Sequence, residues 1–598
     1  MSSRDANDKK LRLGIFYFHD KDGVVNQYVE FLLETMMRHL DDLYIVAGKK
    51  LTPDGRGKFN KYTDIIFTNE NAVDNKEGYG SLINVLGNSF LTEYDQLVLF
   101  DSNLIGPVSD LKYIFEEFES INTDFLNLLT EPGKKMSDFI ICDKKLVGSF
   151  EFNNFWKNNS LDTWNSYFIS KGFTGKNIIE NTKYDSLNSR PWLYYPKELI
   201  KEYNCPFISA ESFNMDYEEF LTESVGQATY ELFKYIQDTK IYDLNLLWDY
   251  LLRHCHQSDL VKLLHLNYVL SDQVVDSGFE ISKKLKIAML IHIYRTDMAE
   301  ELAEYASYMP EGTVVYITTD SQKKKEEIEE VFTVRKIPCF EVRLIENRGR
   351  DVSSKLVGVK DVIMNYDYVC CIHDKKTPHL KPQSIGEGFG YKCFKNIIPS
   401  KQYALNVIRL LEKNPRIGMV VPPEPNHGTF FTTLGLEWVG NYDTTRSLGE
   451  KLGLNVPMAV DKEPVAPFGS FFWFRPKAMK KLYDYDWKYE DFPAEPIADD
   501  ATILHAVERI YPFVVQDAGY YPAVIMAESY ARIEFTNLKY YVRGYNRTLA
   551  AKGIINSFKM MRSELEKSLE EKNEMYAVIQ LYEAQIRELN KQLQDEKE

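Results

Sequence analysis

The feature that most constrains the fold is an internal repeat of apolar strands and amphipathic helices. The segment from Arg12 (RLGIFYFHDKDGVVNQYVEFLLETM) is similar to the segment from Lys286 (KIAMLIHIYRTDMAEELAEYASYM), and each reads as a buried strand followed by an amphipathic helix. Each copy then supplies another apolar run, LYIVAG from Leu43 and VVYITTD from Val314. Alternating strands and helices predict a mainly parallel sheet. We therefore expect two copies of one α/β domain of Rossmann type.

In the second copy, a later strand ends abruptly in charged residues. The apolar run from Tyr368 is followed by His373, Asp374, Lys375 and Lys376. Upstream of it, before a helical segment, lies a polar turn that contains Asn347, Arg348, Gly349, Arg350 and Asp351. Ligands of open α/β sheets bind beyond the carboxyl ends of strands, and basic residues delivered there indicate an anion, most simply a diphosphate. The alternative is that these residues are solvated loop charges, because short loops of this composition are common.

The first copy repeats this layout with different polar residues. A turn with Asn75 and Gly78 precedes a helical segment, and the strand that begins at Gln96 ends in Asp101, Ser102 and Asn103. By analogy with the second copy, Asn75 and Gly78 are substrate-binding candidates. Asp101 and Asn103 offer two oxygen ligands suited to Mg²⁺ or Mn²⁺. The alternative for this triplet is a role in a turn or a helix cap.

An acidic cluster near the end of the second copy is the candidate source of a general base. Glu490, Asp491, Glu495, Asp499 and Asp500 precede a helical segment that carries His505, Glu508 and Arg509. We predict a catalytic carboxylate among Glu495, Asp491 and Asp500, with His505 as a substrate-binding residue. Acidic residues at this position can instead cap the helix and interact with its dipole.

Composition excludes several classes of protein. The chain has 598 residues, 44% of them hydrophobic and 27% charged, which indicates a soluble protein of two to four domains. Its net charge of −16 argues against non-specific nucleic-acid binding. Seven cysteines without C-x-x-C spacing suit a reducing compartment. The polar N-terminus lacks the apolar centre of a signal peptide, and no apolar run is long enough to span a bilayer. We expect a cytoplasmic protein that reaches any membrane-bound substrate from the inner face.

We expect four segments along the chain. They are a first α/β domain over residues 1–200, a helical connector over 201–284, a second α/β domain over 285–550, and an amphipathic helix with a coiled coil over 551–598. The last segment has apolar residues on a heptad that Lys572 interrupts, namely Leu565, Met575, Ile579, Tyr582, Ile586, Leu589 and Leu593. A lone heptad stripe predicts self-association, and hence a homo-oligomer. The basic, amphipathic stretch AKGIINSFKMMRSEL could contact an anionic membrane surface, although packing at the start of the coiled coil is the preferred interpretation.

Several motifs, taken in order, resemble a known family. NRGRD, YDYVCCIHDKKT, NPRIGMVVPPEP, GSFFWFRPKAM and FPAEPIADDATILHAVERIYPFV resemble the rhamnan synthesis protein F family of bacterial glycosyltransferases. In the first copy, FHDKDGVVNQYVEFLL, NKEGYG and DSNLIGP resemble the amino-terminal half of that family. The resemblance implies two GT-A-like nucleotide-sugar domains that assemble a rhamnose-rich cell-wall or surface polysaccharide. It further implies dTDP-L-rhamnose as donor and a lipid-linked glycan as acceptor.

The resemblance also implies roles for the residues singled out above, with two departures. His373 to Lys376 stand where many nucleotide-sugar transferases place an Asp-x-Asp that holds a metal, but only one carboxylate is present and lysines could replace the metal's charge. In the first copy, Asp101 to Asn103 replace the Asn-Asp-Ser or Asn-Asp-Thr expected there. We therefore expect an inverting glycosyltransferase in which one or both domains are active. The alternative is a non-catalytic assembly protein with degenerate nucleotide-sugar domains.

Overall fold

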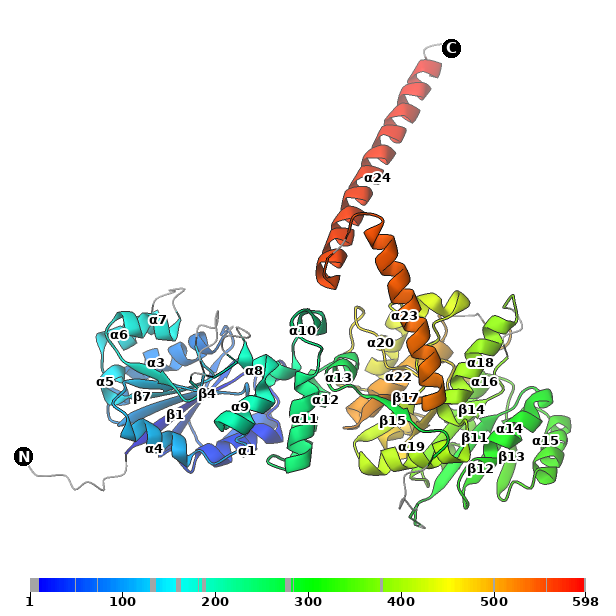
Figure 1. Cartoon of the computed structure of the whole chain (residues 1–598), viewed down its shortest axis with the longest axis horizontal. Coiled ribbons are helices and arrows are strands. Elements are labelled where there is room, and N and C mark those ends of the chain that lie inside the picture. Colours follow the sequence, from blue (N-terminus) through cyan, green and yellow to red (C-terminus); the bar gives the residue numbers. More distant parts are fainter. Residues whose placement is uncertain are drawn as a thin grey trace, which may run out of the picture.

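The computed structural model describes residues 10–48, 50–72, 74–129, 136–157, 163–180, 182–184, 190–274, 281–282, 284–376, 380–497, 501–554 and 556–595. These residues form a seven-stranded sheet, an eight-stranded sheet and a two-stranded sheet, with helices packed around them (Figure 1). The α/β fold class predicted from the sequence is confirmed.

The first large sheet has the strand order β3-β2-β1-β4-β7-β6-β8. Strands β1 to β4 are parallel, β7 runs antiparallel to both β4 and β6, and β8 is parallel to β6. The strands are β1 (Arg12–Phe18), β2 (Asp42–Gly48), β3 (Ile66–Asn69), β4 (Gln96–Asp101), β6 (Phe125–Asn127), β7 (Phe139–Asp143) and β8 (Gly175–Asn177). The helices are α1 (Gln27–Met36), α2 (Pro53–Phe59), α3 (Asn75–Leu91), α4 (Lys112–Ser120), α5 (Lys144–Val147), α6 (Phe150–Lys157) and α7 (Trp164–Ser170).

The second large sheet repeats this topology and adds one strand. Its order is β10-β17-β15-β16-β14-β11-β12-β13, and read from β13 to β17 its strand directions match those from β3 to β8. The strands are β10 (Asn267–Leu270), β11 (Ile287–His292), β12 (Val314–Thr319), β13 (Phe340–Leu344), β14 (Tyr368–His373), β15 (Ile417–Val421), β16 (Phe472–Phe474) and β17 (Tyr521–Ala527).

The longer helices around the second sheet are α14 (Ala299–Ser307), α15 (Gln322–Val334), α18 (Ser384–Ile397), α19 (Lys401–Lys413), α20 (Tyr442–Lys451) and α22 (Ile503–Asp517). Shorter turns of helix are η2 (Thr296–Met298), α16 (Arg350–Ser353), η3 (Ser354–Gly358), α17 (Lys360–Ile363), η4 (Gly428–Thr433), η5 (Pro476–Met479), α21 (Lys480–Asp484) and η6 (Tyr489–Asp491).

Alternate residues of the central strands pack into different apolar clusters. In β11, Met289 and Ile291 belong to one cluster, whereas Ala288 and Leu290 belong to another. Successive side chains of a strand point to opposite faces, so both faces of the sheet are covered. The cluster with Met289 also contains Phe16 of β1, so one apolar core runs from the first sheet to the second.

The segment expected to be a helical connector is helical only in part. After α8 (Pro191–Tyr194) and α9 (Pro196–Tyr203), which begin before it, its helices are η1 (Ala210–Phe213), α10 (Tyr217–Glu223), α11 (Ala228–Thr239), α12 (Leu244–His254) and α13 (Gln257–Leu263). It also contains β9 (Ile208–Ser209), which pairs with β5 (Leu104–Ile105), and β10, which extends the second sheet beside β17. Such short strands depend on partners far away in the sequence, so local pattern does not reveal them.

Buried contacts fix the connector to both sheets. Trp248 of α12 stacks on Tyr521 of β17 with ring centroids 4.3 Å apart. On the other side, the two terminal nitrogens of Arg253 donate to the carboxylate oxygens of buried Asp20 at 2.6 and 2.8 Å, and Nε2 of His254 donates to the same carboxylate at 2.9 Å. Asp20 follows β1, so the connector occupies the carboxyl-terminal edge of the first sheet at this point.

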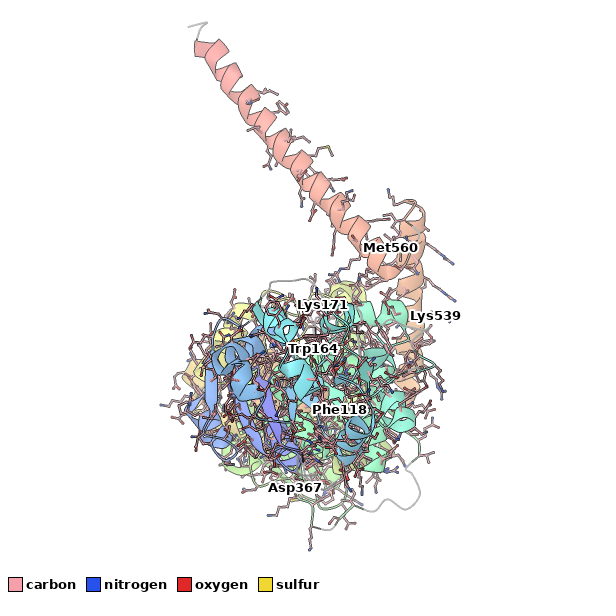
Figure 2. All side chains as sticks on the ribbon, turned by 90° about the vertical axis from the view of Figure 1, so that its left-hand side faces the viewer. Phe118, Trp164, Lys171, Asp367, Lys539 and Met560 are labelled. Carbon is pink, nitrogen blue, oxygen red and sulfur yellow. The ribbon has the colours of Figure 1, made fainter. Side chains whose placement is uncertain are left out.

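The chain ends in two long helices, α23 (Glu528–Ala550) and α24 (Phe558–Asp595). Figures 1 and 2 show α24 projecting away from the two sheets, and its apolar side chains Ile579 and Ile586 are exposed. Helix α24 begins at Phe558, so the amphipathic helix expected from residue 551 is not formed before that point in the described residues. The side chains of Leu589 and Leu593 lie outside the described part. Among the described helices, none is both long and apolar enough to cross a membrane.

Candidate functional site

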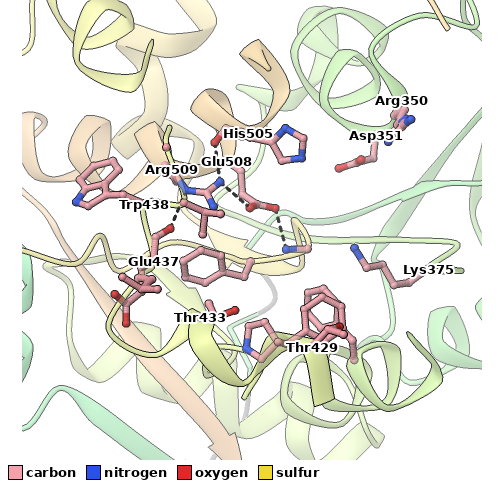
Figure 3. A pocket seen from close by; sticks show the side chains of 18 of the residues that line it. Arg350, Asp351, Lys375, Thr429, Thr433, Glu437, Trp438, His505, Glu508 and Arg509 are labelled. Atoms are coloured by element: carbon pink, nitrogen blue, oxygen red, sulfur yellow. Dashed lines mark hydrogen bonds and ion pairs between the residues drawn. The ribbon is translucent and has the colours of Figure 1, made fainter. Parts of the chain in front are cut away.

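A cavity of about 1450 Å³ lies at the carboxyl-terminal ends of β11 and β14. These strands are parallel neighbours, with His292 opposite His373, so the segments that follow them leave the sheet at the same edge. The start of α22 and the region around η4 complete the lining (Figure 3). Nine of the predicted site residues line this cavity: Asn347, Arg350, Asp351, His373, Asp374, Lys375, Lys376, Glu495 and His505.

His373, the last residue of β14, is held as a neutral ring. Its Nε2 lies 2.8 Å from the carbonyl oxygen of Gly469, and because a carbonyl can only accept, Nε2 carries the proton. Burial lowers the pKa of His373 to about 3, against the opposing effect of Asp351. Its Nδ1 is therefore a hydrogen-bond acceptor at neutral pH, able to accept from a ligand hydroxyl.

Asp351 is a buried carboxylate whose charge is already balanced. Lys355, one turn further along the chain and 2% exposed at its side chain, donates from Nζ to Asp351 Oδ2 at 2.5 Å. Burial alone would raise the pKa of Asp351, but Lys355 and His373 hold it well below its ordinary value. The carboxylate therefore stays ionised, and the ion pair contributes no net charge to the cavity.

Asp374 connects the ends of β11 and β14. Its Oδ2 accepts the backbone N–H groups of Tyr294 and Arg295 at 3.1 and 2.5 Å. Burial raises the pKa of Asp374 to about 6, although both N–H bonds act to lower it. The next residue, Lys375, directs its ammonium group into the cavity, 4.5 Å from the ring centroid of Phe389 (Figure 3).

Arg350 and Glu495 form a two-point ion pair in the lining. Nε of Arg350 donates to Oε1 of Glu495 at 2.9 Å, and Nη2 donates to Oε2 at 3.3 Å. The pair lowers the pKa of Glu495. Arg350 has a left-handed backbone with φ of 50°, directly after Gly349 with φ of 81°. Such a conformation in a residue with a side chain is strained and recurs at functional sites.

Three of the second copy's predicted residues do not take the positions expected of them, and a fourth, Asp500, lies outside the described residues. Arg348 donates to the carbonyl oxygens of Phe492 and Glu490, so it braces a loop instead of facing a ligand. Asp491 accepts the backbone N–H of Lys488 at 2.8 Å, which is the capping role, and it does not line the cavity. Gly349 also lies behind the lining, because a Cβ there would come within 2.7 Å of the Phe492 ring.

The structure adds site residues that the sequence reasoning missed. His292 and Arg295, at and just after the end of β11, line the cavity, as do Thr433 and Trp438 in and after η4. The polar run HIYRTD at the end of an apolar strand is the same signal that singled out His373, so His292 and Arg295 could have been found. No motif marks the η4 region, which reaches the cavity only through tertiary packing.

Glu508 and Arg509, on the second turn of α22, complete this wall. Oε2 of Glu508 accepts the backbone N–H of Gly469 at 2.8 Å, and Oε1 lies 3.5 Å from Arg509 Nη1. The two sides of the Gly469 peptide segment are thus held by Glu508 and His373.

The first sheet's predicted residues make contacts among themselves. Oδ1 of Asp101 accepts the backbone N–H of Asn103 at 2.9 Å, and Oδ2 accepts from the side-chain amide of Asn75 at 3.0 Å. Asn75 and Gly78 lie in the first turn of α3 and not in a loop, because Asp74 caps the helix by accepting from the Glu77 N–H. Gly78 packs against the Tyr17 ring, which a Cβ would approach to 2.3 Å.

Neither sheet offers a donor set that fits a divalent cation among the residues that the structure describes. Asp101 is 1% exposed and already bonded at both oxygens, whereas the Asn103 side chain is exposed, so the predicted metal pair does not converge. Within the part of the chain that the structure describes, no group of three or more His, Cys, Asp or Glu side chains is placed to hold a metal.

Two of the solved structures to which the chain is similar are glycosyltransferases. A mannosyltransferase, PcManGT from Pyrobaculum calidifontis in complex with GDP-Man and Mn²⁺, is 10% identical, with 43% of this chain and 60% of that chain covered and a TM-score of 0.26. The glycosyltransferase GlyE of Streptococcus pneumoniae TIGR4 is 13% identical, with 60% of this chain and 84% of that chain covered and a TM-score of 0.21.

Sequence comparison gives the family. The protein WxcX of Xanthomonas campestris pv. campestris (strain B100), itself uncharacterized, is 26% identical over 234 residues, which is 39% of this chain. The chain spans 32% of the length of that relative. The model of the family described as rhamnan synthesis protein F matches residues 43–520, which include the strands of both large sheets except β1, β17 and the first residue of β2. The chain therefore belongs to the rhamnan synthesis protein F family.

Proposed function

We propose that the chain is a glycosyltransferase that moves a sugar from a nucleoside diphosphate to a glycan, with the reaction at the cavity of the second sheet. The observation that carries this proposal is the convergence, in one cavity of about 1450 Å³, of Arg350 and Lys375 with the carboxylate of Glu495. Cationic groups suit the diphosphate of a donor, and a carboxylate suits the acceptor hydroxyl. The volume is sufficient for a nucleotide sugar together with the end of an acceptor.

The proposed reaction is a single displacement with inversion. Glu495 takes the proton of the acceptor hydroxyl as the hydroxyl oxygen attacks the anomeric carbon of the sugar. The bond from that carbon to the diphosphate oxygen breaks, and the nucleoside diphosphate leaves with the bonding electron pair. Arg350 and Lys375 stabilise the charge that develops on the diphosphate. Asn347 and His373 supply neutral hydrogen-bonding groups to the nucleotide or the sugar.

Family membership supports a more specific donor and acceptor. We infer that the donor is dTDP-L-rhamnose and that the product is a rhamnose-rich cell-wall or surface polysaccharide, extended on a lipid-linked acceptor at the cytoplasmic face of the membrane. The two large sheets then form the cores of two GT-A-like domains. Because Asp101 and Asn75 bond to each other and the connector covers Asp20, we assign a structural role to the first of these domains.

Self-association is the proposed role of α24. Its exposed apolar residues on the heptad, among them Ile579 and Ile586, need a partner surface, and a second copy of the helix supplies one. The first turns of α24 are tied to the connector, where Arg562 pairs with Glu218 at 2.6 Å.

A donor screen tests the proposed activity. Full-length protein is incubated with a panel of nucleotide sugars and a lipid-linked acceptor, and nucleotide release and glycan mass are followed. The proposal expects one donor to be consumed, with loss of transfer in Glu495→Gln and retention in Asp101→Asn. Loss of transfer in Asp101→Asn but not in Glu495→Gln would instead place the active site at the first sheet. The rival function is that of a non-catalytic assembly protein. The observation in its favour is that both carboxylate oxygens of Glu495 are bonded to Arg350. It predicts glycan binding without nucleotide release.

A further inference from the structure

Two cationic side chains in the lining of the cavity have no carboxylate partner among the described residues. Arg295 and Lys375 are both half-buried, and within that part of the chain neither forms an ion pair. Other basic residues of the lining are paired: Arg350 with Glu495, Lys376 with Asp297, Lys462 with Asp259 and Arg509 with Glu508. A cation that is partly removed from water without an ion-pair partner is costly, and Arg295 interacts only through space with Asp374 and Asp297. Such a pair indicates an anionic ligand.

The fold fixes the place of both cations. Arg295 follows β11 and Lys375 follows β14, and these strands are paired in register up to His292 and His373. Asp374 then accepts the backbone N–H of Arg295, which ties the segment carrying one cation to the residue next to the other. The carboxylate in this position thus organises the two basic residues.

The surroundings keep the Lys375 ammonium accessible from the cavity. Its Nζ lies over the Phe389 ring, which stabilises a cation without neutralising it. A Cβ at Gly469 would lie 3.5 Å from Nζ, so any side chain there would take up space beside the ammonium. Gly469 is held in place from both sides, by His373 Nε2 on its oxygen and Glu508 on its nitrogen.

Three carboxylates near these two cations already have other partners. Asp351 is paired with Lys355, Asp374 accepts two N–H groups, and Glu508 accepts the Gly469 N–H. The donor set therefore suits an anion better than a divalent cation. This inference rests on the proposed function. We propose that Arg295 and Lys375 balance the negative charge of the nucleoside diphosphate in place of a divalent metal. Nucleotide binding is then independent of metal.

Nucleotide binding measured by calorimetry tests this inference without relying on turnover. Full-length protein is titrated with dTDP, UDP and GDP, in one series with EDTA and in another with Mg²⁺ or Mn²⁺. We expect one nucleotide to bind with the same Kd, within about twofold, in both series. Lys375→Gln and Arg295→Gln should each weaken binding by about tenfold or more, as expected for the loss of a charge-assisted hydrogen bond. Lys375→Arg should restore part of the affinity.

The control and the contrary outcomes separate this inference from the proposed function. Lys401→Gln removes an exposed lysine of α19 that does not line the cavity, and it should leave Kd unchanged. Binding that requires Mg²⁺ or Mn²⁺ would overturn the inference while the proposed transferase stands, and so would unchanged affinity in folded Lys375→Gln and Arg295→Gln. Failure of every nucleotide to bind in both series would overturn the inference and the proposed function together.

Discussion

Arg350 and Glu495, 145 positions apart in the sequence, meet in a two-point ion pair in the wall of the cavity, with contacts of 2.9 and 3.3 Å. Both side chains are partly exposed, at 48% and 38%, so a ligand can reach either of them. In the proposed reaction, the guanidinium of Arg350 binds the diphosphate and the carboxylate of Glu495 binds the acceptor hydroxyl. Donor binding that draws Arg350 toward the diphosphate would release Glu495 to act as a base, which couples the two substrates.

Replacing Glu495 by Gln should reduce transfer by about 100-fold or more while nucleotide affinity changes little, because removal of a general base affects the chemical step. The measurement is kcat from product formation, set beside Kd for the nucleotide. Glu490→Gln is the matched control, since Glu490 is exposed and uses only its backbone oxygen to hold Arg348. Equal activity in the two variants would remove Glu495 from the mechanism.

The pH dependence of transfer should reflect the effect of the Arg350–Glu495 ion pair on the pKa of Glu495. The hydrogen bond from Arg350 lowers the pKa of Glu495, so the base stays ionised to a lower pH than an ordinary glutamate. In Arg350→Gln that stabilisation is lost and the pKa of Glu495 rises toward its usual value. The acid limb of the kcat/KM profile should therefore move to higher pH, whatever the change in maximal rate. An acid limb at the same pH in both proteins would show that Glu495 is not the titrating group.

Gly349→Ala should damage the site more than a matched glycine replacement elsewhere. Gly349 has φ of 81° and Gly312 has φ of 85°, so alanine is strained at both, by about 1 kcal/mol or more. Only at Gly349 does the added Cβ collide, at 2.7 Å from Phe492 Cγ and 2.8 Å from Ser353 Cβ, whereas nothing among the described residues lies within 4 Å at Gly312. We expect Gly349→Ala to lose nucleotide affinity and Gly312→Ala to keep it, with the thermal unfolding midpoint lowered in both. Unaltered binding in Gly349→Ala would show that the turn does not position the cavity wall.

Asp20→Asn should destabilise the protein by about 3 kcal/mol, because it breaks a buried ion pair between the first sheet and the connector. Asp22→Asn is the control, since Asp22 also pairs with Arg253 but is 41% exposed, and exposed pairs contribute little. Thermal unfolding of both variants gives the comparison.

The same pair should depend on pH in a defined direction. Burial alone would raise the pKa of Asp20, but hydrogen bonds from His254 and Arg253 hold it well below its ordinary value. The contribution of ionised Asp20 to stability is therefore present above the pKa of an unfolded aspartate, about 4, and is lost as pH falls further. The difference in stability between wild type and Asp20→Asn should shrink at low pH. A difference that grows instead would contradict this account.

Substitutions on α24 should change the oligomeric state of the protein, and hence its mass in solution. Ile579→Glu combined with Ile586→Glu places charges on the predicted heptad seam and should yield monomers. Val578→Glu, also exposed but off the seam, should leave the oligomer intact. Sedimentation velocity distinguishes these outcomes, and a monomeric wild-type protein would exclude self-association through α24.

Several elements of the fold could be predicted because their signals are local. The strands β1, β4, β11 and β14 are continuous apolar runs with polar ends, and burial on both faces of a sheet requires that pattern. The strands β9 and β10 are too short to be marked in this way, and they exist because β5 and β17 offer them partners. The helix start at Asn75 is not predicted, because the glycines of NKEGYG indicate a turn, although Asp74 caps the helix by accepting the backbone N–H of Glu77.

The repeat, the two strand ends and the family are all visible in the sequence, because apolar periodicity and the motifs after a strand are properties of contiguous residues. The tertiary structure alone decided which charges are available to a ligand. Arg348, Arg350, Lys375 and Lys376 look alike in the sequence, yet of these four only Lys375 faces the cavity without a carboxylate partner among the described residues. The physical reason is that an ion pair depends on which distant residue lies within a few ångströms, and chain separation carries no information about that distance.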